Sequence, residues 1–128
     1  MSGPFILITT NTINEGQLEG VKRLSTRFAE RVRAADTGLL AFSFYLNDEG
    51  TEVSNVQVHR DAASMDAYLP IAQELIQEAL SITTTESIDV YGTPGPVVQQ
   101  VLRMNAEQGA RVHVTSDRIS GFTAPASA

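Results

Sequence analysis

Two neighbouring stretches of the chain alternate between apolar and polar residues, and this pattern strongly limits how the chain can fold. The apolar positions are Leu40, Phe42, Phe44 and Leu46 in the first stretch, then Val56 and Val58 in the second. The positions between them hold Ser43 and Tyr45, then Asn55, Gln57 and His59. Because successive side chains of a strand point to opposite faces, the pattern predicts two strands, Leu39–Leu46 and Val53–Arg60, with one apolar and one polar face. The polar face is a candidate pocket wall.

A strand register follows if the apolar positions of both strands share one face. The pairs are then Phe42 with Val56, Phe44 with Ser54, Ser43 with Asn55, and Ala41 with Gln57. This register leaves residues 48–50 as a three-residue loop. Such loops usually end in a residue with positive φ, and Gly50 stands at that position. We therefore expect the polar residues of the two strands to gather on one surface.

The remaining sequence predicts two further strands, three helices and a short terminal strand. The strands are Phe5–Thr10, Thr84–Tyr91 and Arg111–Thr115, and the helices are Glu15–Ala35, one capped by Asp61, and one from Pro96 to Gly109. The order β-α-β-β-α-β is that of a ferredoxin-like α+β fold, with an antiparallel sheet and helices on one side. We expect residues 1–92 to form this domain and residues 93–128 to extend it with a helix, a strand and a disordered tail from Thr123.

Composition excludes several classes of function. The 128 residues (13.8 kDa) suit one domain, and the absence of cysteine excludes disulfides, thiolate metal sites and a cysteine nucleophile. A net charge of −6 argues against nucleic acid or an anionic membrane as partner. No apolar run approaches the ~18 residues of a membrane span, and the N-terminus lacks the charged start of a secretory signal. We expect a cytoplasmic protein.

Positive charge is concentrated in one predicted helix. Arg23, Arg27 and Arg31 recur every four residues and form a row on one helix face. A solvated face neutralised by neighbouring carboxylates explains this row better than an anion-binding site.

The chain from about Phe5 to Gly92 resembles the antibiotic-biosynthesis-monooxygenase-like families of the dimeric α/β-barrel superfamily. The resemblance is carried by the element order and by the segments 38–45, 48–52, 56–61 and 67–69. It implies a homodimer in which the sheets of two copies face each other, which would cover the second sheet face. Many relatives carry an aromatic residue, often Trp, where this chain has His59, and a helical His where it has Tyr68. Relatives that degrade haem use that Trp and that His, so the resemblance does not support haem degradation here.

Relatives that oxygenate polyketide phenols use neither metal nor flavin, so the resemblance implies a reaction without a cofactor on a small aromatic phenol or quinol. The protein need only bind the substrate, deprotonate it and stabilise the anion. His59 is the predicted general base, because imidazole titrates near neutral pH, and Asp89 is predicted to orient it or to act as base itself. The residues predicted to bind substrate are Tyr45, Asn55, Gln57, Tyr91, Ser43 and Tyr68, and no metal site is predicted.

The same residues are compatible with two other hypotheses of function. The polar face could belong to a non-enzymatic ligand-binding or interaction dimer of the same fold. It could also serve an isomerase or cyclase that uses the same base without O₂.

Overall fold

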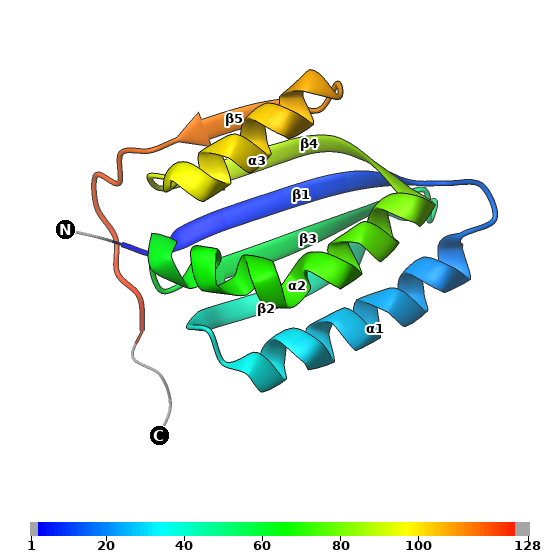
Figure 1. The fold of residues 1–128 in the computed structure, drawn as a ribbon, viewed down its shortest axis with the longest axis horizontal. Coiled ribbons are helices and arrows are strands. Elements are labelled where there is room, and N and C mark those ends of the chain that lie inside the picture. The colour runs from blue at the N-terminus through cyan, green and yellow to red at the C-terminus, as the bar shows by residue number, and fades with distance from the viewer. Residues whose placement is uncertain (1–2, 125–128) are drawn as a thin grey trace.

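The computed structural model describes residues 3–124 and shows a single sheet with three helices on one of its faces (Figure 1). The strands are β1 (Phe5–Ile13), β2 (Leu39–Leu46), β3 (Glu52–His59), β4 (Thr83–Tyr91) and β5 (Arg111–Thr115). The helices are α1 (Leu18–Ala35), α2 (Ala62–Ile82) and α3 (Pro96–Glu107). Of the predicted tail, residues 125–128 lie outside the described part.

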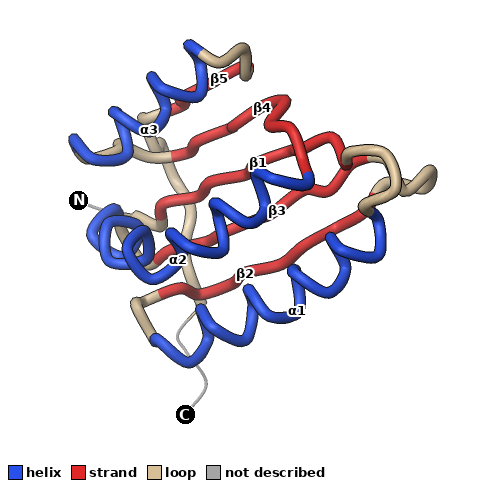
Figure 2. The backbone as a smooth tube through the Cα atoms, turned by 45° about the vertical axis from the view of Figure 1, so that its right-hand side comes forward, coloured by secondary structure: helices blue, strands red, loops and turns tan. Residues whose placement is uncertain are grey.

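The strand order is β2-β3-β1-β4-β5, in which the first four strands are antiparallel and β5 runs parallel to β4. This arrangement of the first four strands, with both crossovers made by helices, confirms the predicted ferredoxin-like α+β fold. Figure 2 shows α1, α2 and α3 on the same side of the sheet. Within residues 3–124, no helix is both long and apolar enough to cross a membrane.

Local chemistry explains where the helices begin and end. The Asp61 carboxylate accepts a hydrogen bond from the backbone N–H of Ser64 at 2.9 Å, which satisfies a free donor in the first turn of α2. Pro96 occupies the first turn of α3, where its missing N–H costs nothing. Gly109 follows that helix with a φ of 104°, a conformation that glycine adopts easily.

The register between β2 and β3 differs from the predicted one by a single residue. Phe44 pairs with Asn55 and Phe42 with Gln57. The cause is Asn47, whose carboxamide Oδ1 accepts hydrogen bonds from the backbone N–H groups of Thr51 (2.8 Å) and Glu52 (3.0 Å). Asn47 N–H in turn donates to the Glu52 carbonyl at 3.1 Å, so the loop has four residues, 48–51, rather than three. Gly50 has the positive φ expected of it, at 71°.

A shift of one residue exchanges the two faces of a strand. Asn55, Gln57 and His59 therefore lie on the face that the helices cover, together with Phe42 and Phe44. Val56 and Val58 lie on the opposite face, which we call the outer face, with Ser43 and Tyr45. The prediction that all polar residues of both strands share one surface is wrong, because it rested on the three-residue loop.

The core lies between the helices and the covered sheet face. Its buried side chains include Phe5 and Leu7 of β1, Leu24 and Phe28 of α1, and Met65, Tyr68 and Leu75 of α2. Aromatic rings meet at its centre, where Phe28 stacks on Tyr68 with ring centroids 6.4 Å apart. Burial of this apolar surface holds the helices on the sheet.

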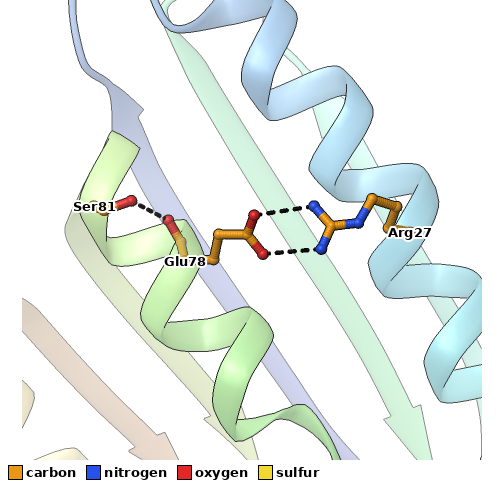
Figure 3. Close-up of polar contacts among 3 residues, drawn as sticks. All are labelled: Arg27, Glu78 and Ser81. Carbon is orange, nitrogen blue, oxygen red and sulfur yellow. Dashed lines mark hydrogen bonds and ion pairs between the residues drawn. The ribbon is translucent and has the colours of Figure 1, made fainter.

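One surface ion pair connects α1 with α2 (Figure 3). The Arg27 guanidinium donates two hydrogen bonds to the Glu78 carboxylate, at 3.0 and 3.1 Å. This pairing raises the pKa of Arg27 and lowers the pKa of Glu78. The middle residue of the arginine row is thus neutralised by a carboxylate of the neighbouring helix.

Candidate functional site

A cavity of about 180 Å³ lies between the helices and the covered face of the sheet. Side chains of β1, β2, β3 and β4 form its floor, and side chains of α1, α2 and α3 form its walls. Most of the lining is aliphatic or aromatic. The volume is below the roughly 300–1,000 Å³ of pockets for drug-sized ligands, so the space suits a small molecule.

Most polar side chains of the lining lie on the sheet floor, whereas Ser25 of α1 and Asn105 of α3 lie on the walls. The polar side chains of the floor are Thr9, Asn11, Asn55, Gln57, Thr83 and Thr85, and Tyr68 adds its hydroxyl from α2. Among the described residues of the lining, Tyr68 alone has an ionisable side chain. Its burial raises its pKa well above the usual range, so the hydroxyl stays protonated at neutral pH.

A hydrogen-bonded chain links Tyr68 to the sheet. The Gln57 amide Nε2 donates to the Asn55 carboxamide Oδ1 at 2.7 Å and to the Tyr68 hydroxyl at 3.2 Å. Asn55 in turn donates from Nδ2 to the Ser43 carbonyl at 3.2 Å. Because the Tyr68 oxygen accepts from Gln57, its own hydrogen is left to donate to another acceptor.

His59 lies directly behind this chain and is fully buried. Its ring Nε2 lies 2.9 Å from Gln57 Oε1, and its Nδ1 lies 2.9 Å from the Ser64 hydroxyl. Since Gln57 Oε1 can only accept, Nε2 carries the hydrogen, and Nδ1 accepts from Ser64. Burial lowers the pKa of His59 to about 4, against a smaller opposing effect of the Asp61 charge. The imidazole is therefore neutral at pH 7, with both ring nitrogens occupied, and it does not line the cavity.

The predicted site residues separate into two groups. Asn55, Gln57, His59 and Tyr68 are joined through hydrogen bonds under the helices. Ser43, Tyr45, Asp89 and Tyr91 lie on the outer face of the sheet.

Asp89 does not face His59, which corrects the expectation that it orients the imidazole. On β1, His59 pairs with Phe5 and Asp89 pairs with Ile8. Phe5 and Ile8 are three residues apart, so their side chains point to opposite faces of the sheet. Asp89 instead lies 3.7 Å from the His113 ring on β5.

Asn11 is a cavity residue that sequence reasoning missed. It stands on β1 beyond the predicted end of that strand, Thr10, because the strand continues to Ile13. Its Nδ2 donates to the Thr83 hydroxyl at 2.8 Å, whereas its buried Oδ1 has no hydrogen-bond partner in the described structure. The signal in the sequence is the series Leu7, Thr9 and Asn11, because every second residue of a strand points to the same face.

No protein-family model matches this chain, and no curated protein matches it. Solved structures do. MupZ from Pseudomonas fluorescens superposes with a TM-score of 0.71 at 22% identity, covering 94% of this chain and 91% of MupZ. The putative antibiotic biosynthesis monooxygenase from Nitrosomonas europaea has a TM-score of 0.64 at 11% identity, covering 75% of this chain and 95% of its own. Rv0793 from Mycobacterium tuberculosis has a TM-score of 0.62 at 15% identity, with coverages of 73% and 97%.

These similarities show a shared fold, the one that the resemblance in sequence implied. The match to MupZ covers 94% of this chain and therefore extends beyond β4 into the α3–β5 segment. The other two matches cover about three quarters of the chain.

Proposed function

We propose that this protein is a cofactor-independent, monooxygenase-like enzyme that binds a small aromatic phenol or quinol in the cavity under the helices. The observation that carries the proposal is a mainly apolar cavity whose lining includes the protonated Tyr68 hydroxyl, which accepts a hydrogen bond from the buried Gln57 amide. An aromatic ring fits the apolar walls, and its phenolic oxygen accepts a hydrogen bond from Tyr68. The fold shared with a putative antibiotic biosynthesis monooxygenase is consistent with this assignment.

In the proposed reaction the electrons come from the substrate. A substrate R₂CH₂ activated by a phenolic group gives a proton to solvent and binds as its anion. The carbanion R₂CH⁻ adds to O₂ to form a C–O bond and a peroxide anion. The peroxide then takes up a proton and loses water, which gives the overall change R₂CH₂ + O₂ → R₂C=O + H₂O. The Tyr68 hydroxyl stabilises the phenolate on which the negative charge resides, and the apolar walls exclude bulk water.

His59 remains the predicted base, but its position favours a supporting role. Both ring nitrogens are hydrogen-bonded, and Gln57 separates the ring from Tyr68. We propose that His59 holds Gln57, and through it the Tyr68 hydroxyl, in the orientation that a bound oxyanion needs. Asp89 and Tyr45, on the outer face, take no part in this site.

Oxygen uptake by the purified, chelator-treated protein tests the proposal with anthrones, hydroquinones and dihydroxynaphthalenes as substrates. We expect uptake above the spontaneous rate, and a loss of about 10²-fold in turnover in Tyr68→Phe, which removes one donor to the oxyanion. Tyr45→Phe removes the same hydroxyl from the outer face and is the matched comparison. Uptake that depends on Tyr45 rather than Tyr68 would move the site to the outer face.

His59→Ala separates the two roles of the imidazole. A base would give a pH–rate profile that changes shape in the variant, whereas a residue that positions Tyr68 lowers turnover without changing the profile. Gln57→Leu should reproduce the positioning defect, because it breaks the same chain between His59 and Tyr68.

A specific observation favours a second function, an isomerase or cyclase. The ionisable group on the cavity wall is a protonated tyrosine, which is an acid rather than a base. Such a donor can protonate or polarise a carbonyl or ether oxygen during a ring closure or a double-bond shift. Consumption of a carbonyl substrate under anaerobic conditions would support this function, and binding without any turnover would support a non-enzymatic ligand carrier.

We also propose that a second copy of the chain covers the outer face. The central strands place four aliphatic side chains there, Ile6 and Ile8 of β1 and Val56 and Val58 of β3, which pair across the strands. In a single copy these residues are only half-buried. A contiguous apolar patch at the centre of a sheet marks an interface, and a homodimer would cover it without leaving the same patch free on a partner.

A further inference from the structure

We infer that Asn11 is a second recognition point in the cavity and that the ligand carries a hydroxyl or N–H group opposite the oxygen held by Tyr68. This inference rests on the proposed function and narrows its substrate class to elongated aromatic molecules with polar groups at both ends. It concerns the end of the cavity furthest from His59.

The Asn11 carboxamide has an acceptor without a partner. Its Oδ1 is buried and has no hydrogen-bond partner in residues 3–124. A buried acceptor without a partner destabilises a folded protein, and such groups are rare unless a ligand or water satisfies them. Asn11 lines the cavity, and a ligand that displaces the atoms covering this oxygen would bond to it.

The orientation of the Asn11 amide is fixed by Thr83. The Thr83 hydroxyl donates its single hydrogen to the Ala79 carbonyl at 2.8 Å. The Thr83 oxygen can then only accept from Asn11, at 2.8 Å, so it contacts the amide nitrogen. Rotation of the Asn11 amide would place two acceptors against each other, and the free atom is therefore the oxygen.

Polar groups are spaced along β1 on the face that lines the cavity. Gln57 pairs with Leu7, Asn55 pairs with Thr9, and Asn11 follows two positions further on the same face. Four residues of a strand span roughly 13 Å. The two ends of the floor are therefore far apart, with Tyr68 and Gln57 at one end and Asn11 and Thr83 at the other. A single-ring phenol satisfies one end, whereas a fused-ring diol reaches toward both.

The two ends differ in hydrogen-bonding character. Tyr68 offers a hydrogen, and Asn11 offers a lone pair. The matching ligand has an oxygen acceptor or phenolate at one end and a neutral donor at the other. A methyl ether at the second position lacks the donor and should bind less tightly.

The test compares the binding of 2,6-dihydroxynaphthalene and 2-naphthol under anaerobic conditions, so that oxidation does not interfere. Isothermal titration calorimetry should show about fivefold tighter binding of the diol to the wild-type protein, the gain from one neutral hydrogen bond. Asn11→Leu should remove this preference while 2-naphthol still binds. Thr10→Val, next in the chain and on the outer face, should keep the preference.

Equal binding of the two probes, or a preference that survives in Asn11→Leu, would overturn the inference and leave the proposed function standing. Binding of neither probe would contradict both the inference and the proposed aromatic substrate.

A measurement without ligand tests separately whether Oδ1 of Asn11 lacks a hydrogen-bond partner. Asn11→Leu removes the unpartnered Oδ1 together with the Nδ2 hydrogen bond to Thr83. Because an unpartnered buried group costs more than a hydrogen bond contributes on balance, the thermal unfolding midpoint should stay the same or rise. If leucine is too large for the site, the thermal unfolding midpoint of Asn11→Val makes the same comparison with a smaller side chain. A lower midpoint in both variants would show that the oxygen is already satisfied, and the inference would fail.

Discussion

Nε2 of His59 lies 2.9 Å from Oε1 of Gln57, and this contact turns the amide nitrogen of Gln57 toward Tyr68. His59 is fully buried and does not line the cavity. Through Gln57 it nevertheless sets the orientation of the Tyr68 hydroxyl, which faces the cavity. The ring also meets Tyr68 edge-on, with centroids 5.6 Å apart, so packing and hydrogen bonding constrain the same pair.

The first prediction concerns the pH dependence of stability. Burial holds the pKa of His59 at about 4, against 6.5 in the unfolded chain, so the unfolded state binds more protons between these values. The stability that His59 contributes is complete above pH 6.5 and is lost as the pH falls toward 4. Urea denaturation of wild type across this range should show a decrease of up to about 3 kcal/mol from this residue.

His59→Gln is the matched variant, since it removes the titrating group and keeps hydrogen-bonding capacity. Its stability should change less between pH 6.5 and 4 than that of the wild type. An equal dependence in both proteins would show that the imidazole is not buried as described. ¹⁵N spectra of the histidine ring should in addition show the hydrogen on Nε2 at pH 7.

The second prediction concerns the turn that sets the strand register. Asn47→Ala removes the acceptor for two backbone N–H groups and should lower the free energy of unfolding by about 1 kcal/mol, as for a lost side-chain cap. Chemical denaturation measures this change. Asp48→Ala, in the same loop, is the control and should have a smaller effect. If the two variants lose the same amount, Asn47 does not organise the loop.

The third prediction concerns the outer face. Val58→Lys places a charge among the aliphatic side chains of β1 and β3 and should convert a dimer into a monomer, as measured by sedimentation velocity. Thr26→Lys adds the same charge to the exposed surface of α1 and should leave the dimer intact. A wild-type protein that sediments as a monomer at high concentration would contradict the proposed dimer.

The fold was largely predictable because its signals are local and repeated. The spacing of apolar residues in α1, the Asp61 cap and Pro96 each place an element through the chemistry of a few neighbouring residues. Only a few sheet topologies are compatible with this order of elements, and the ferredoxin-like topology is the one observed.

The site was less predictable because its position depends on one hydrogen-bonded side chain in a loop. A three-residue and a four-residue loop both accommodate Gly50, and the choice between them exchanges the faces of β3. The apolar outer residues Val56 and Val58 favoured the wrong choice, since apolar side chains usually lie under helices. Asn55, Gln57 and His59 could be identified as a polar group, but their burial under the helices could not.

The most direct test of the account is methyl NMR during an anaerobic titration with 2,6-dihydroxynaphthalene. Leu24 and Ile88 carry methyl groups on the cavity lining, and Ile8 and Val56 carry them on the outer face. We expect chemical-shift changes only for the methyl groups of Leu24, Ile88 and their neighbours in the lining. The methyl shifts of Ile8 and Val56 should not change. Changes confined to Ile8 and Val56, or no changes at all, would contradict the account.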